Sequence, residues 1–207
     1  VLMADALRRG VLTVEANGPE ETSGLLVRNR GTEPVLILDC EAVEGMRMGE
    51  TTDQSVLLGP ASVTRVPTSS GAVEKWSGGE TEERFGHCLE SFPLLDNQVG
   101  ILAFLGQHLL GLDVLGCPDL YADLHRRLLT SYLLTGEVSS GAAELETPAE
   151  QSEIQALARA LEEAERVAAP CPGNGEYTTI HGQVTGGELR HNGQLVHLSV
   201  CPSGAAA

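Results

Sequence analysis

Strand-like and helical segments occupy separate parts of this chain, and this separation constrains the fold more than any other feature. Short apolar segments divided by turn residues fill residues 11–66, whereas the long amphipathic patterns lie later in the chain. Residues 177–199 are strand-like again and contain His191-Asn192-Gly193-Gln194, a strong signal for a two-residue hairpin turn. Elements that are grouped rather than alternating favour an α+β fold over a doubly wound sheet.

The predicted order is a β-rich N-terminal half, a central hairpin, two helices and a C-terminal β-hairpin, all in one compact domain over residues 1–207. A short helix ending at Gly10 precedes the first strand. A long irregular loop with at most one short element near residues 85–89 is expected over residues 67–98. The hairpin follows at residues 99–115. The two helices are expected at residues 117–136 and 147–167, with an internal linker at residues 137–146 between them.

The charge balance narrows the classes of partner. The chain has 13 basic and 29 acidic residues, a net charge of -16, so phosphate backbones and anionic membrane surfaces are repelled. We therefore expect no nucleic acid and no membrane partner. The five cysteines are dispersed and odd in number, which argues against a disulfide framework and predicts reduced thiols in a cytoplasmic protein.

An acidic cluster follows the apolar strand predicted over residues 35–38. Asp39, Glu41 and Glu44 are positioned for acid–base work or ligand binding, and Arg47 is close enough in sequence to contact an anion. Trp76, the only tryptophan, lies in the expected loop and completes the candidate ligand-binding set. The alternative is a polar strand exit that leads into a turn at Gly45.

The C-terminal hairpin offers a second candidate. With Asn192-Gly193 as the turn, the regular register places Glu188 opposite His197, where the carboxylate would favour the imidazolium. This pair is either half of a catalytic dyad or a structural contact on a half-exposed face. The six histidines and five cysteines form no spacing typical of a metal site, and no complete phosphate loop is present, so we predict neither metal nor cofactor.

Two stretches resemble a known family. One runs from Gly24 to Asp39, continues through Glu41 and Gly45, and includes residues 55–58 and 63–67; the other runs from Val99 to Tyr132 and includes residues 195–198. Together they resemble the domain associated with ADP-ribosyl glycohydrolases and rhodanese-like phosphatases, the ARPP family. The resemblance implies an α+β intracellular domain and a link to NAD or ADP-ribose metabolism.

The chain departs from the family pattern at its polar positions. After the position of Glu41, sequences of the family tend to continue with Gly-Ala-Lys-Gln-Asn-Arg, whereas this chain reads Gly45-Met46-Arg47-Met48-Gly49-Glu50. A scaffold without those polar residues favours a non-catalytic binding or accessory protein for a peptide or protein partner, such as a precursor peptide in a biosynthetic pathway. The alternative is an enzyme or sensor for an ADP-ribose or NAD-related ligand. Exposed strand edges of two copies of the chain can also pair, so we expect a homodimer formed through an edge strand.

Overall fold

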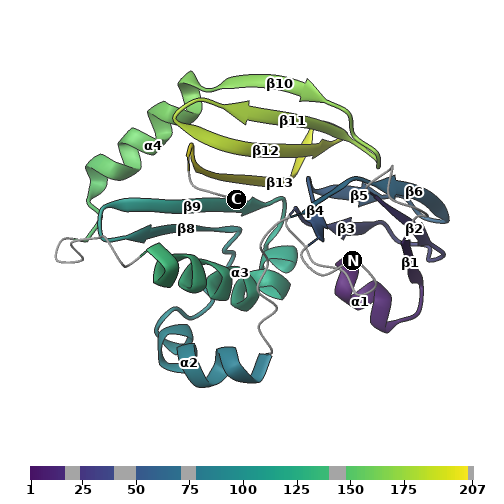
Figure 1. Ribbon diagram of the computed structural model, residues 1–207, viewed down its shortest axis with the longest axis horizontal. Coiled ribbons are helices and arrows are strands. Elements are labelled where there is room, and N and C mark those ends of the chain that lie inside the picture. The colour runs from purple at the N-terminus through teal and green to yellow at the C-terminus, as the bar shows by residue number, and fades with distance from the viewer. Residues whose placement is uncertain (17–23, 40–49, 71–77, 140–147, 205–207) are drawn as a thin grey trace.

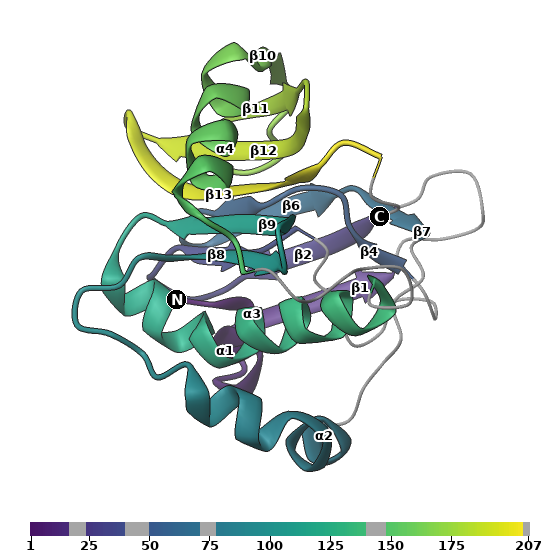
Figure 2. The same ribbon diagram turned by 90° about the vertical axis from the view of Figure 1, so that its left-hand side faces the viewer.

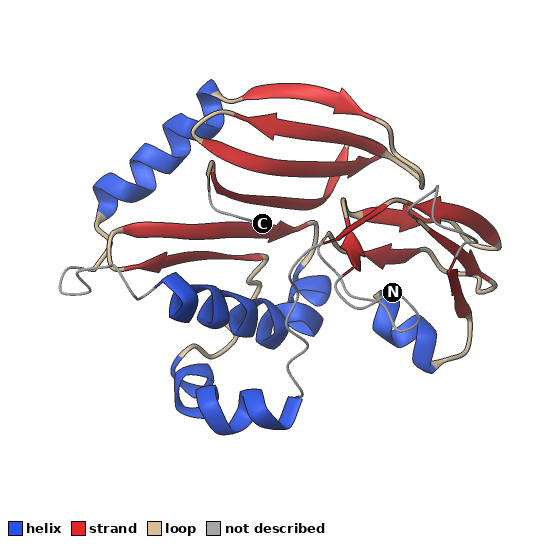
Figure 3. Ribbon diagram, in the orientation of Figure 1, coloured by secondary structure: helices blue, strands red, loops and turns tan. Residues whose placement is uncertain are grey.

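The computed structural model describes residues 1–16, 24–39, 50–70, 78–139 and 148–204. Strands and helices are segregated along the chain, and the predicted α+β class is confirmed (Figures 1 and 3). The predicted turn at Asn192-Gly193 is present, because both residues have positive φ, 51° and 75°, as a type I′ turn requires.

The N-terminal part consists of one helix and small antiparallel sheets. Helix α1 spans Met3–Arg8, and Gly10 ends it with φ of 67°. The strands form the pairings β1-β2-β6, β3-β5 and β4-β7. Their bounds are β1 Leu12–Ala16, β2 Leu25–Asn29, β3 Val35–Ile37, β4 Glu50–Thr52, β5 Val56–Leu58, β6 Ser62–Val66 and β7 Thr68–Ser70.

The C-terminal part is a six-stranded antiparallel sheet in the order β10-β11-β12-β13-β9-β8. Helix α3 lies against β8 and β9, and helix α2 packs beneath α3 (Figure 1). The bounds are α2 Gly78–Ser91, β8 Gly100–Leu105, β9 His108–Leu115, α3 Pro118–Ser139, α4 Gln151–Glu163, β10 Glu165–Ala169, β11 Glu176–His181, β12 Val184–His191 and β13 Gln194–Pro202.

The two faces of this sheet carry separate cores. Leu157 and Ala160 of α4, with Ala164 just after it, pack with Ile180 and Val200 on one side. On the other side, Leu115, Tyr121, Leu124 and Leu189 pack with Leu36 and Leu38 from the N-terminal strands. This second core is continuous across both parts of the chain, because Leu36 of β3 packs with Leu115 of β9 and with the partly buried Val196 of β13. Figure 2 shows α4 and α3 on opposite sides of β8 and β9.

Several predicted boundaries are wrong. The irregular loop expected over residues 67–98 contains β7 and the 14-residue helix α2. The sequence gives little sign of α2, because the helix begins with Gly78-Gly79 and its apolar stripe consists only of Phe85 and Leu89. These two side chains pack on Leu129 of α3. Helix α3 extends to Ser139, into the expected linker of residues 137–146, whose remaining part lies outside the described residues.

The last helix is shorter than its periodicity predicts. Helix α4 ends at Glu163 rather than near Val167, and the next residues form β10. Helix α4 also begins at Gln151 rather than at residue 147, and the Glu153 carboxylate accepts the Glu150 N–H at its start at 2.8 Å. Residues Glu165–Ala169 all pair with β11, and these inter-strand hydrogen bonds outweigh the helical preference of the local sequence.

Candidate functional site

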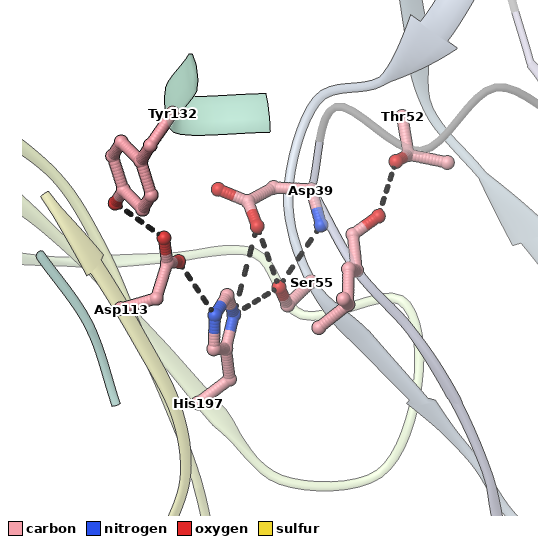
Figure 4. A network of polar contacts seen from close by, with 7 residues as sticks. Asp39, Thr52, Ser55, Asp113, Tyr132 and His197 are labelled. Atoms are coloured by element: carbon pink, nitrogen blue, oxygen red, sulfur yellow. Dashed lines mark hydrogen bonds and ion pairs between the residues drawn. The ribbon is translucent and has the colours of Figure 1, made fainter. Parts of the chain in front are cut away.

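His197 occupies the centre of a buried polar network between the two parts of the chain. It lies on β13 beside β9, and its residue is 2% exposed. Asp39, which directly follows β3 and Leu38, approaches it with Oδ1 3.5 Å from His197 Nδ1. Figure 4 shows both side chains pointing toward each other. Two residues selected from the sequence on separate grounds thus meet in one place.

The other four predicted ligand-binding residues lie outside the part of the chain that the structure describes. Glu41, Glu44 and Arg47 fall within residues 40–49, and Trp76 falls within residues 71–77; both segments lie outside the described residues. Their membership of a site stays a prediction.

The expected partnership of Glu188 and His197 is wrong by one position. The register pairs Glu188 with Leu198 and Leu189 with His197, because a β-bulge between Leu189 and Arg190 shifts the hairpin. A one-residue shift moves a side chain to the opposite face of the sheet. Glu188 instead forms an ion pair with Arg190.

Ser55, which lies just before β5, joins His197 to Asp39. The Ser55 hydroxyl is 2.8 Å from His197 Nδ1, accepts the Asp39 N–H at 3.0 Å and donates to Asp39 Oδ1 at 3.1 Å. With His197 doubly protonated, Nδ1–H donates to Ser55, and both lone pairs and the proton of the hydroxyl are used. Ser55 is 2% exposed, so this oxygen is a satisfied core atom.

Asp113 on β9 holds the opposite side of the imidazole. Its Oδ1 lies 3.1 Å from His197 Nε2, and its Oδ2 accepts the Tyr132 hydroxyl of α3 at 2.5 Å. Gly111 provides the space for this approach, since a Cβ there would lie 2.8 Å from the Tyr132 oxygen. The network therefore connects α3, β9, β13 and the residues around β3 and β5 (Figure 4).

The ionic states follow from these contacts. Burial alone would lower the pKa of His197, but the hydrogen bond to Asp113 and the charges of Asp39 and Asp113 outweigh it and raise the pKa above 6.5. Burial would raise the pKa of Asp113, yet the hydrogen bond and charge of His197, with the Tyr132 and Ser199 hydroxyls, hold it below 3.8. These shifts favour the imidazolium form of His197 and the carboxylate form of Asp113.

The neighbouring acids stay protonated. Burial and then the charge of Asp113 raise the pKa of Tyr132, so this phenol remains a hydrogen-bond donor. Burial, followed by the charges of Asp39 and Asp113, raises the pKa of Cys201 and disfavours its thiolate. Neither group supplies a nucleophile near neutral pH.

The order hydroxyl, imidazole, carboxylate resembles the triad of serine hydrolases, but the protonation differs. A triad histidine must be neutral to accept the serine proton. Here the raised pKa favours the charged ring, the serine is buried, and its proton is directed to Asp39. The arrangement is suited to holding β-strands together and unsuited to general base catalysis. Across the described ranges, no set of three or more His, Cys, Asp or Glu side chains is placed to hold a metal ion.

Sequence reasoning missed Asp113, Ser55 and Tyr132. Asp113 had a detectable signal, because it interrupts the apolar segment from Leu109 to Leu115 in a strand expected to be buried. Ser55 had none, since it precedes an apolar strand as an ordinary polar residue. Its meeting with His197 joins positions 142 residues apart.

The stability that this ion pair provides should depend on pH. The folded pKa of His197 lies above 6.5, so its contribution is complete below 6.5 and is lost as pH rises through the folded value. The folded pKa of Asp113 lies below 3.8, so its contribution is lost only as pH falls through that lower value.

We therefore expect the difference in unfolding free energy between the natural chain and His197→Gln to be largest between pH 4 and 6.5 and to shrink in alkaline solution. Urea unfolding across this range measures it. A difference that grew as pH rose would show that His197 is neutral in the folded chain.

The fold and the network define an α+β protein with a buried ion pair at the junction of its sheets. The family model of the ARG and Rhodanese-Phosphatase-superfamily-associated Protein domain, ARPP-1, matches residues 68–201. The chain belongs to this family, as the resemblance implied. Asp113, Tyr132 and His197 lie inside the matched range, whereas Asp39 and Ser55 precede it. No curated protein and no solved structure is similar enough to this chain to count as a match.

Proposed function

We propose that this chain is a non-catalytic accessory protein that binds a peptide or protein partner. The observation that carries the proposal is the saturated state of the polar network. Within the described residues, the acid, imidazole and hydroxyl groups that meet around His197 are bonded to one another, and all of them except the Asp39 carboxylate are buried. Groups in this state stabilise the scaffold, and the remaining chemistry open to the surface is recognition.

An exposed sheet edge supports recognition of an extended segment. Strand β10 is the last strand in the order of its sheet and pairs with β11 on one side. Four of its five residues are exposed, and Val167 is 44% exposed. Such an edge accepts an added strand through main-chain hydrogen bonds. The net charge of -16 favours a basic partner.

The same edge supports pairing between two copies of the chain. A homodimer would compete with an added peptide strand for β10, so sedimentation at increasing concentration should be measured with and without peptide. The described cysteines Cys88, Cys117, Cys171 and Cys201 are free, which supports a reducing, cytoplasmic setting. Within the described ranges, no helix has the length and apolar character needed to cross a membrane.

Calorimetric titration of the full chain with basic peptides and with proteins encoded beside its gene tests the proposal. We expect saturable binding to at least one of them and no turnover of the bound partner. Failure of every such partner to bind would contradict the proposal.

A second candidate is an enzyme or sensor for an ADP-ribose or NAD-related ligand. The observation in its favour is Asp39, whose side chain is 24% exposed while it contacts the buried histidine, so one end of the network reaches the surface. A thermal-shift measurement with NAD, ADP-ribose and divalent metals separates the two candidates. Ligand that binds only the folded state must raise the melting temperature, and we expect no rise.

A further inference from the structure

We infer that an open pocket between α4 and the β8–β9 turn binds an apolar side chain of a peptide, and that basic residues flank this side chain in the peptide. The inference rests on the proposed function and assigns it a site. The pocket lies beside α4, on the face of the sheet opposite the one that α3 covers and that His197 faces.

The pocket is built from four strands of the C-terminal sheet and one face of α4. Its volume is about 360 Å³, at the lower end of the range for small-ligand sites, which is room for one large apolar side chain. The apolar groups that line it come from β8, β9, α4, β12 and the end of β13: Phe104, Leu109, Leu157, Ala160, Val184 and Pro202.

Small residues on α4 create the hollow. Ala156 and Ala160 are one helical turn apart and both line the pocket, so the helix presents two methyl groups where longer side chains would fill the space. Leu157 forms the floor at 7% exposure, whereas Ile154, one turn earlier, is 50% exposed. The apolar face of α4 is therefore incompletely covered at its N-terminal half.

The strand opposite α4 is also irregular at this point. The pairing of β8 with β9 shifts register between Ala103 and Phe104. Ala103 pairs with Gly111 and Phe104 with Leu109, so Leu110 is the extra residue and the bulge lies in β9. A bulge redirects side chains on its own strand. The residue beside it, Leu109, lines the pocket opposite Phe104.

The polar residues that line the pocket favour a positively charged partner. Glu153 lines the pocket, and hydrogen bonds from the Ser152 hydroxyl and the Glu150 N–H lower the pKa of its carboxyl, so it is negative at neutral pH. Gln107, His108 and Gln183 supply the remaining polar lining. With a net charge of -16 on the whole chain, lysine or arginine beside the apolar anchor is the complementary choice.

Two capped synthetic peptides test the inference, Lys-Lys-Leu-Lys-Lys and the same peptide with serine in place of leucine. They are titrated into the isotope-labelled full chain and followed by amide NMR. We expect the leucine peptide to shift the amides of Leu109, Leu157 and Val184 and to bind at least tenfold more tightly than the serine peptide. Equal affinity for the two peptides would contradict the inference that the pocket binds an apolar side chain.

Matched variants of α4 locate the site. Ala156 lines the pocket, whereas Ala158 is exposed on the same helix and does not. Ala156→Arg should weaken binding of the leucine peptide at least tenfold, while Ala158→Arg, which adds the same charge, should leave it within twofold. Equal affinities for the two variants, or no binding of the leucine peptide, would overturn the pocket assignment. Binding of either peptide along β10 alone would overturn it and leave the proposed function intact.

Discussion

Replacing His197 with alanine should lower the unfolding free energy by about 3–5 kcal/mol. The side chains of His197 and Asp113 are 3% and 10% exposed, so removal of the imidazolium leaves the Asp113 carboxylate buried without its counter-charge. It also removes the contact with the Ser55 hydroxyl. Guanidinium unfolding monitored by circular dichroism measures the loss.

His181→Ala is the matched control for this variant. His181 is exposed on β11 and contacts the neighbouring Thr179 hydroxyl, so its removal should change the unfolding free energy by less than about 0.5 kcal/mol. If both alanine variants lost the same small amount, the network would contribute little to stability.

The second large effect is a non-additive one between His197 and Asp113. Asp113→Leu alone should cost about 3–5 kcal/mol, because the imidazolium loses its closer carboxylate. The double variant His197→Leu with Asp113→Leu, compared with each of these two substitutions alone, removes both buried charges together. Apolar replacement of a whole buried pair is often nearly neutral, so the double variant should be more stable than the sum of the single losses predicts.

We expect a coupling energy of about 2 kcal/mol from this double-mutant cycle. The Tyr132 hydroxyl loses its acceptor in both the single and the double variant, so this cost cancels in the cycle. Tyr132→Phe measured alongside reports the complementary loss, that of the donor to Asp113 Oδ2, about 1–3 kcal/mol. Strictly additive losses would show that His197 and Asp113 do not interact as an ion pair in the folded chain.

Local signals in the sequence were sufficient for the turns and most strands. Asn192-Gly193 predicted its hairpin turn, and Val35–Ile37 formed the expected apolar strand, because each pattern is determined by neighbouring residues. Strand β10 was missed for the opposite reason. Arg166 and Val167 follow a helical repeat, and only their pairing with Ile180 and Thr179 makes them a strand.

The candidate site was predicted in part and for incomplete reasons. Asp39 and His197 were selected, but the expected partner of His197 was Glu188, and the bulge beside Leu189 places a different residue opposite it. The actual partners, Asp113 and Ser55, come from β9 and from the residues before β5. Such contacts depend on how sheets from distant parts of the chain pack, and periodicity contains no information about that packing.

The protonation of His197 tests most directly whether the network is structural. Nitrogen NMR of the full chain at pH 7 distinguishes a ring with both nitrogens protonated from a neutral ring. We expect an imidazolium with both protons hydrogen-bonded, one toward Ser55 and one toward Asp113, and titration above 6.5. A neutral ring at pH 7 with a bare Nδ1 facing the Ser55 hydroxyl would be a competent general base and would contradict a non-catalytic role.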